Sequence, residues 1–375
     1  MPPRISISPP LLNTATPWAT THDDLAALYA LPHTGAVTTR TALLTHGFDE
    51  DPLLHQHAFI APSSSVNTYG YSPYPLSHYL SFISSILSDA SPPPQSQSQS
   101  QEQGQGQKKP FIVSVTGTAA EVRVCVAGVS RWAARMVPAV TVYVEVNLSC
   151  PNIPDKPPPA YSSAALREYL SALHELQTAV AASTAARGGR DGGGDGDGEG
   201  EVRGEVKGGG DIKGIPEIVP VGFKTPPYTY QAQFDELLSA IEEFPSVLSF
   251  ITATNTLGNA LFLAPSAATG TDTPPDEGNG GMRPVVSGAS GTGIAGLAGE
   301  SIHPLSLGNV FTIRKMLDAS EKEEVRDIVI IGAGGVGDAE GYRRMRAAGA
   351  AAVGVGTALG RDGVGVFERI LDSTV

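Results

Sequence analysis

The chain has 375 residues, of which 41% are hydrophobic, and its formal net charge is −13 at pH 7. The negative charge argues against a nucleic-acid or anionic-membrane surface, because such surfaces require clustered Lys and Arg. The length suits a closed α/β barrel, which commonly runs to ~250 residues or more as one domain.

Eight short apolar runs are typical of β-strands. They lie at residues 10–13, 35–39, 111–115, 142–148, 219–224, 248–255, 328–333 and 351–356. Amphipathic helical patterns alternate with them, at 22–30, 75–90, 119–136, 163–183, 232–244, 306–320, 338–349 and 364–373. Near-continuous apolar strands suit a parallel sheet that is buried on both faces. Eight strand–helix units therefore predict an α/β fold, a (β/α)8 TIM barrel, with an open doubly wound sheet as the alternative.

Three stretches are predicted to be flexible surface insertions. Residues 91–109 are rich in Ser and Gln, 188–214 in Gly and charged residues, and 264–281 in Pro, Gly and Thr. The first two cannot bury enough apolar surface to offset the entropy lost on ordering. None separates regions of different character, so we expect one domain over residues 1–375.

The N-terminus and the cysteines indicate the compartment. The first residues lack the apolar run of a signal peptide, and the chain has no run long enough to be predicted as a membrane span. The two cysteines, Cys125 and Cys150, provide no disulfide framework and suit a reducing compartment. We therefore expect a cytoplasmic protein without a membrane partner.

Polar residues stand where the predicted strands end, and in a barrel the chemistry occurs at that end. The fourth strand delivers Asn147, with Cys150 and Asn152 just beyond it, and a short loop carries Asn67. Other strand ends provide Thr14, Ala15, Arg40, Lys224, Thr254, Asn255 and Thr256. Such a set of amides and donors suits a flat polar heterocycle with carbonyl and ring N–H groups.

Glycine turns follow the last two strands, at Gly334-Gly335 and at Gly356-Thr357. Backbone N–H groups at such turns and helix starts can bind a phosphate, and barrels commonly use this place for it. The run from Gly332 to Gly337 also matches a dinucleotide fingerprint formally, but the next strand lacks the acidic residue that a Rossmann unit requires. The phosphate interpretation is therefore favoured.

Several blocks together resemble a known family. NLSCPNIPDKP, GFKTPPY, TNTLGNALF, GIAGLAGESIHP, IIGAGGVGDAEGY and GVGTAL resemble the dihydroorotate dehydrogenases of class 1, closest to the fumarate-using class 1A. The blocks occur in the family's order and cover most of the chain outside the insertions. The resemblance implies an FMN-dependent homodimer that oxidises dihydroorotate to orotate in pyrimidine (UMP) biosynthesis, with fumarate as the electron acceptor.

The resemblance also implies residue roles. Cys150 stands where the family has its general base, which takes a proton from C5 of the substrate while hydride passes from C6 to the flavin. An ordinary thiol has a pKa of ~8.5 and is mostly protonated at neutral pH, so it can serve as a base if the site lowers that value modestly. The substrate-binding positions are Arg40, Asn67, Gly70, Asn147, Asn152, Asn255 and Thr256. The cofactor-binding positions are Thr14, Ala15, Arg40, Asn147, Lys224, Thr254, Ala298, Gly299, Gly334, Gly335, Gly356 and Thr357.

The chain departs from the family's pattern near the substrate. Arg40 replaces a lysine, and Tyr69 and Tyr71 are bulkier than the family's residues. The stretch THGFDEDPLLHQHAF replaces a Gly-Asn-Pro-Glu-Pro-Arg loop. Two alternatives stay open: a divergent flavin oxidoreductase acting on another dihydropyrimidine or an enoate, and a flavin-binding scaffold without turnover. The histidines show no metal-ligand spacing, with His55 and His57 in an expected surface loop, so no metal is predicted.

Overall fold

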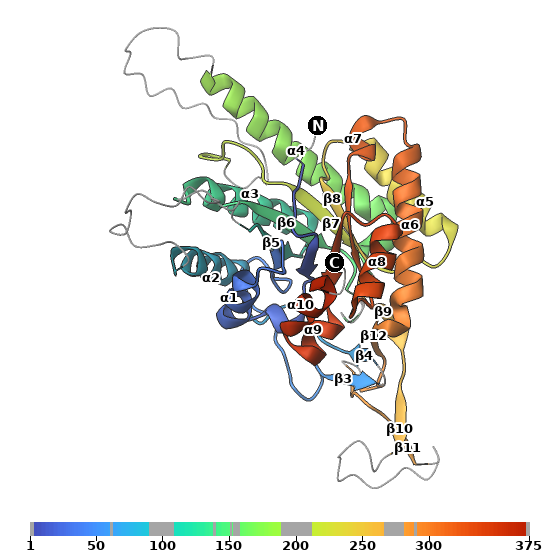
Figure 1. The fold of residues 1–375 in the computed structure, drawn as a ribbon. Helices are drawn as coiled ribbons and strands as arrows, with labels where there is room; N and C mark the ends of the chain where they lie inside the picture. Colours follow the sequence, from blue (N-terminus) through green and yellow to red (C-terminus); the bar gives the residue numbers. More distant parts are fainter. Residues whose placement is uncertain are drawn as a thin grey trace.

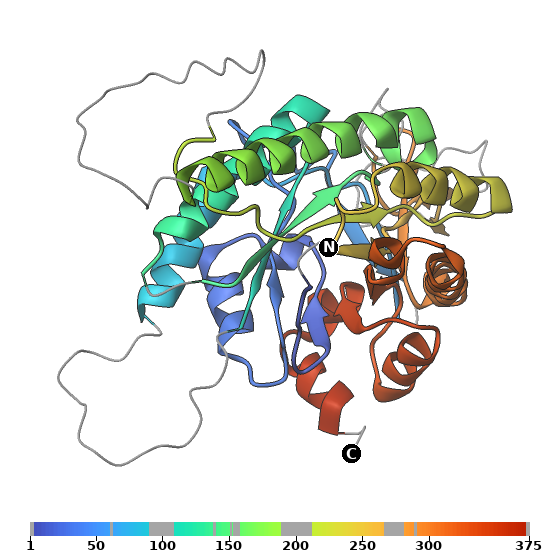
Figure 2. The same ribbon diagram turned by 90° about the horizontal axis from the view of Figure 1, so that it is seen from above.

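The fold is built on eight parallel strands that form a nearly closed barrel. The computed structural model describes residues 4–60, 63–89, 109–137, 140–150, 152, 158–188, 212–265, 281–288 and 291–372. The strand order is β1-β14-β13-β8-β7-β6-β5-β2. A parallel bridge between Leu12 and Ala36 brings the two edge strands together. Helices surround the strands on the outside (Figures 1 and 2). The predicted TIM barrel is confirmed.

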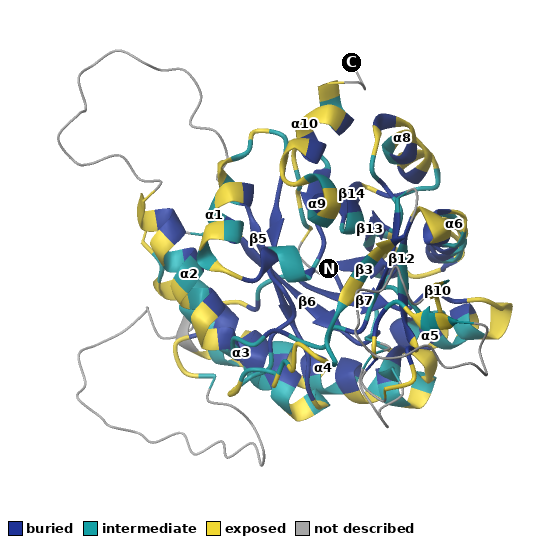
Figure 3. Cartoon of the chain, turned by 90° about the horizontal axis from the view of Figure 1, so that it is seen from below, coloured by how far each residue is buried: buried dark blue, intermediate teal, exposed yellow. Residues whose placement is uncertain are grey.

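All eight predicted barrel strands are present. They are β1 (Leu11–Asn13), β2 (Val37–Thr38), β5 (Phe111–Val115), β6 (Val142–Asn147), β7 (Val221–Thr225), β8 (Phe250–Ala253), β13 (Val329–Ala333) and β14 (Ala352–Val355). Their residues are almost all buried, as the colours of Figure 3 show, because helices cover the outer face and side chains fill the interior. Inside the barrel, the hydroxyls of Ser114 and Thr252 donate to the buried carboxylate of Glu145, at 2.9 and 2.7 Å.

The eight predicted helices are also present, with small differences in length. They are α1 (His22–Ala30), α2 (Leu76–Asp89), α3 (Ala119–Arg135), α4 (Ser163–Gly188), α5 (Gln231–Glu243), α6 (His303–Ala319), α8 (Ala339–Ala347) and α10 (Gly365–Asp372). Two short helices were not predicted, α7 (Glu323–Arg326) and α9 (Thr357–Asp362). Helix α6 begins three residues earlier than predicted, where Pro304 fits the first turn. Helix α4 runs five residues further, to the start of a predicted insertion.

Local sequence explains where the helices begin and what they bury. Thr21 with Asp24 and Thr118 with Glu121 form capping boxes at the starts of α1 and α3. Cys125 is fully buried on α3 and belongs to the hydrophobic core. No helix among the described residues combines the length and apolarity needed to cross a membrane.

A second, antiparallel sheet lies against one end of the barrel and was not predicted. Its order is β3 (His57–Ile60), β4 (Ser64–Asn67), β12 (Ala295–Gly299) and β9 (Leu257–Ala260). Figure 1 shows it below the barrel, with the hairpin of β10 (Leu263–Pro265) and β11 (Met282–Pro284) projecting beyond it. Asn67 and His57 were expected in loops. They instead end β4 and begin β3.

The predicted insertions lie mostly outside the described residues. Where their ends are described, they belong to the fold. The first two residues predicted for the third insertion, Ala264 and Pro265, are part of β10. Lys109, predicted as the last residue of the first insertion, is half-buried and donates to the main-chain oxygens of Leu28, Tyr29 and Leu31. Its ammonium group therefore supplies hydrogen-bond donors to carbonyl oxygens at the C-terminal end of α1, which have no partners within the helix.

Candidate active site

A cavity of about 320 Å³ lies between the carboxyl ends of the barrel strands and the second sheet. Every residue predicted for the catalytic, substrate and cofactor positions lines it, from Thr14 after β1 to Thr357 after β14. The second sheet contributes Asn67 from β4 and Ala298 and Gly299 from β12. The barrel mouth thus brings together residues that are hundreds of positions apart in the sequence.

The amide side chains near Cys150 form a connected network. Asn147 Nδ2 donates to Thr41 Oγ1 at 3.0 Å, and its Oδ1 accepts from the hydroxyl of Ser149 at 2.9 Å. Asn255 Nδ2 donates to the same Ser149 hydroxyl at 3.0 Å. Because the two amides share one hydroxyl, their orientations are fixed relative to one another.

A second group of amides, Asn67 and Asn152, lines the same cavity. Asn152 Nδ2 donates to the Tyr69 carbonyl at 2.9 Å and to Asn67 Oδ1 at 3.1 Å. An added Cβ at Gly296 would lie 2.5 Å from Thr256 Oγ1, so the missing side chain lets β12 approach this wall closely. Four asparagines therefore line the same cavity as the thiol, and amide groups suit a planar polar ring.

Cys150 is partly buried, and burial raises the pKa of its thiol. The backbone N–H of Asn152 and the positive charges of Lys224 and Arg40 lower this pKa, but by less than burial raises it. In this site the net effect on the pKa of the Cys150 thiol is upward, because burial outweighs the two positive charges. A base at this position starts as a thiol, and its activity depends on losing a proton first.

Lys224, at the end of β7, is 4% exposed and lines the cavity. Among the residues that the structure describes, no carboxylate or hydrogen-bond acceptor pairs with its ammonium group. A cation that lines a cavity without a protein partner is available to a ligand. The arrangement therefore favours a ligand with an acceptor at this place, such as a ring carbonyl or an anionic nitrogen.

Arg40 lines the same cavity but is not free. Its two terminal nitrogens form a bidentate pair with Glu50, at 2.8 and 3.2 Å. Glu50 was not predicted from the sequence. The loop that stands in place of the family's loop contains Asp49, Glu50 and Asp51 in succession, and no pattern distinguishes them.

The other end of the cavity is formed by the glycine turns. Gly334 and Gly335 have φ of +132° and +72°, a region that favours glycine, and a Cβ on Gly334 would lie 2.0 Å from Ser306 Oγ. His303 Nδ1 donates to the Gly334 carbonyl at 2.8 Å, which fixes Nε2 as the acceptor for Arg344 Nε at 3.1 Å. Arg344 also lines the cavity, as does Arg361 of α9, and neither was predicted. Backbone donors and guanidinium groups suit a phosphate.

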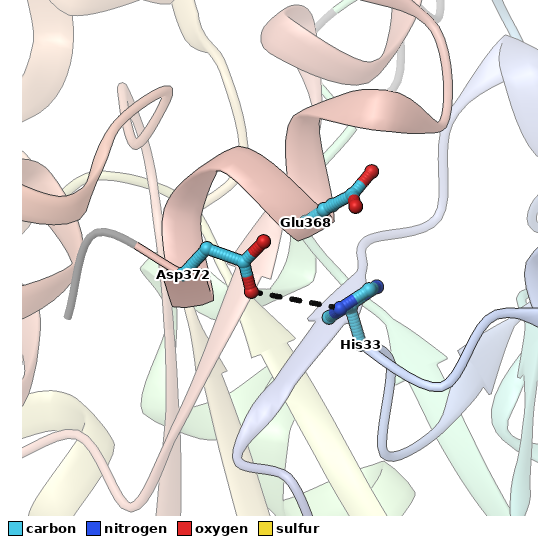
Figure 4. A group of neighbouring side chains, drawn as sticks. All are labelled: His33, Glu368 and Asp372. Atoms are coloured by element: carbon cyan, nitrogen blue, oxygen red, sulfur yellow. Dashed lines mark ion pairs between the residues drawn. The ribbon is translucent and has the colours of Figure 1, made fainter. Parts of the chain in front are cut away.

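Among the residues that the structure describes, one group of side chains that could hold a metal ion lies elsewhere. Figure 4 shows His33, Glu368 and Asp372, whose ligand atoms lie within 4.8 Å of one another. His33 Nε2 is 3.8 Å from the Asp372 carboxylate. His33 precedes β2, on the side of the barrel away from the cavity, and both carboxylates are exposed. The group has no connection with the cavity, and the expectation of no metal stays a prediction.

The barrel and its cavity at the carboxyl ends of the strands define the class of protein, an α/β-barrel enzyme. The family model of dihydroorotate dehydrogenase matches residues 27–374, and the chain therefore belongs to the dihydroorotate dehydrogenase family. The resemblance seen in the sequence blocks is confirmed.

Individual relatives agree with this assignment. The chain is 28% identical to "Dihydroorotate dehydrogenase (fumarate)" of Trypanosoma cruzi (strain CL Brener), over 97% of this chain and 87% of that protein. It is 25% identical to "Putative dihydroorotate dehydrogenase A (fumarate)" of Streptococcus equi subsp. equi (strain 4047), over 96% of this chain and 86% of that protein. The crystal structure of ligand-free dihydroorotate dehydrogenase from Eimeria tenella superposes with a TM-score of 0.62 at 15% identity, covering 97% and 83% of the two chains. That likeness supports the fold.

Proposed function

We propose that the protein is an FMN-dependent enzyme that oxidises dihydroorotate to orotate in pyrimidine (UMP) biosynthesis, with fumarate as the electron acceptor. The observation that carries the proposal is Cys150 among four asparagines in the cavity that also holds the glycine turns. The family and the names of its fumarate-using relatives support the substrate and the acceptor.

The cavity residues fit FMN. The backbone at Gly334, Gly335, Gly356 and Thr357 would hold the phosphate, since these residues line the cavity and a Cβ on Gly334 or Gly335 would clash with its neighbours. Ala298, Gly299, Thr14 and Ala15 would border the ribityl chain, and Thr254, Asn147 and Lys224 the ring. Bound FMN would supply a two-electron acceptor for the hydride that leaves the substrate.

The chain's own residues would do the rest of the chemistry. Asn67, Asn147, Asn152 and Asn255 would orient the substrate ring through their amide groups. The Cys150 thiolate would take the proton from C5 of the substrate. The same amides would hold the ring so that C5 lies next to the sulfur. The nearby charges of Lys224 and Arg40 stabilise the thiolate relative to the thiol.

We propose a cytoplasmic homodimer. The two cysteines are free thiols, which suits a reducing compartment. Five large apolar side chains near the projecting hairpin are between 40% and 49% exposed: Leu261, Phe262, Leu263, Met282 and Ile294. Such a patch is typical of a protein interface, and a second copy of the chain is the occupant that the family suggests.

The visible spectrum of the purified protein tests the function. We expect a yellow protein whose flavin band bleaches when dihydroorotate is added without oxygen and recovers when fumarate follows. A yellow protein that bleaches only with another dihydropyrimidine or an enoate would favour the second candidate, which the paired Arg40 and the bulky Tyr69 motivate. A yellow protein that no substrate bleaches would favour the scaffold, and a colourless one would remove the flavin proposal.

A further inference from the structure

The pair of Arg40 and Glu50 forms part of the cavity wall. The side chain of Arg40 is 6% exposed and that of Glu50 is 21% exposed. Besides Glu50, Arg40 Nη2 contacts the Gly70 carbonyl at 3.4 Å, and Nη1 contacts Thr20 Oγ1 at 3.5 Å. Both terminal nitrogens are therefore used within the protein. The guanidinium also lies over the ring of Tyr69, 5.3 Å from its centre.

The segment that carries Glu50 is anchored beside the substrate wall. Phe48 N donates to the Ser72 carbonyl at 2.8 Å, and the Phe48 ring fills the space where a Cβ of Gly70 would be, at 2.3 Å. The backbone carbonyl of Tyr69, whose ring lies against the Arg40 guanidinium, accepts a hydrogen bond from the side-chain amide of Asn152. The segment of Glu50 is thus tied, through Phe48 and residues 69–72, to Asn152, two residues after Cys150.

The charge of this pair matters to the cavity. The charged and titratable groups that face Cys150, among the described residues, are Lys224 from β7, Arg40 after β2, Tyr71 after β4 and Tyr169 from α4. A bidentate carboxylate cancels most of the field that a guanidinium exerts at a distance. Of the two cations near the thiol, Lys224 then acts on the cavity with its full charge and Arg40 with a reduced one.

We propose that Glu50 is a positioning residue that holds Arg40 against the cavity wall and cancels its charge, and that the pair sets how strongly the cavity binds an anionic substrate. The proposal rests on the proposed function for its substrate, while the ion pair itself does not. Arg40 is then a part of the cavity wall, and the asparagine side chains and Lys224 are the groups that contact the ligand.

Binding of orotate and of uracil, which has the same ring without the carboxylate, tests the proposal in the purified holoenzyme. We expect Glu50→Gln to tighten orotate binding roughly fivefold, because it removes one negative charge near a partly buried anion, and to leave uracil binding unchanged. Asp49→Asn is the matched control, since it makes the same change of charge one residue away at an exposed side chain. Orotate binding that stays the same, weakens, or changes together with uracil binding would overturn the proposal.

A double variant separates charge from shape. Arg40→Ala alone leaves the Glu50 carboxylate uncompensated at the cavity, so it should weaken orotate binding more than Arg40→Ala combined with Glu50→Ala. A double variant that binds as weakly as Arg40→Ala would show that Glu50 has no electrostatic role.

Alkylation of Cys150 gives a readout that needs neither flavin nor substrate. Its rate with iodoacetamide, measured against pH, should have a lower midpoint in Glu50→Gln than in wild type or Asp49→Asn, because an uncancelled Arg40 stabilises the thiolate. Cys125 will not interfere, because burial raises its pKa to about 12. A protein that bound neither flavin nor orotate would contradict the proposed function. The change in the pH midpoint of Cys150 alkylation would still test the role of Glu50. An unchanged midpoint would count against it.

Discussion

The direction of the Cys150 pKa predicts how the reaction depends on pH. An ordinary thiol with a pKa of ~8.5 is about 3% ionised at pH 7. Burial raises the pKa of Cys150 above its usual value, so the thiolate fraction is smaller still. Below the pKa this fraction grows tenfold for each pH unit. We therefore expect the rate of flavin reduction by dihydroorotate to rise nearly tenfold from pH 7 to pH 8.

Anaerobic stopped-flow measurement of flavin bleaching between pH 6 and 9 isolates this step from reoxidation. Cys150→Ala should slow bleaching by roughly 10²- to 10⁴-fold, the usual contribution of a positioned base, and should remove the pH slope. Cys125→Ala is the matched control, because that residue lies in the core on α3. A wild-type rate that is flat from pH 7 to pH 8 would refute the raised pKa, and an alanine variant that keeps the slope would refute the assignment of the base.

Three further changes test the cofactor end and the assembly. Gly334→Ala should destabilise the protein by about 1–3 kcal/mol and lower the FMN content of the purified protein, because its Cβ would overlap Ser306. Gly308→Ala on α6 is the control: its Cβ would meet open space, so the variant should keep FMN and have a slightly higher Tm. Lys224→Met should lower FMN affinity yet leave the Tm of the flavin-free protein unchanged or higher, since the ammonium group lines the cavity and pairs with no described residue; a lower Tm would contradict this. Phe262→Asp should convert the dimer to a monomer on size-exclusion chromatography, and an unchanged elution volume would remove this patch from the interface.

The sequence predicts the barrel well because each barrel strand carries its own signal. Phe111–Val115 and Val142–Asn147 are short apolar runs, and burial on both faces makes such runs continuous rather than alternating. The site follows from the same logic. Once the strands are known, Asn147, Lys224 and Asn255 must meet at the mouth, because parallel strands in a barrel end on one side.

The second sheet could not be predicted in the same way. Strand β12 pairs with β4 and β9, and Gly296 lies opposite Asn67 across more than half of the chain. The strands are four or five residues long, and β12 reads Ala-Gly-Leu-Ala-Gly, a composition that β-propensity disfavours. Long-range pairing stabilises these strands, so no local window of the sequence contains the information.

Arg40 shows the same limit at a single residue. The sequence reveals that an arginine replaces the family's lysine and that a different loop follows, and these read as two separate departures. The structure shows that the two departures are connected, because the Glu50 carboxylate of the different loop accepts hydrogen bonds from both terminal nitrogens of Arg40. A lysine has a single ammonium group and could not form this bidentate contact, so the guanidinium and the loop carboxylate depend on each other. The two departures are therefore one change in the cavity wall, and its effect on substrate binding has to be judged for the pair.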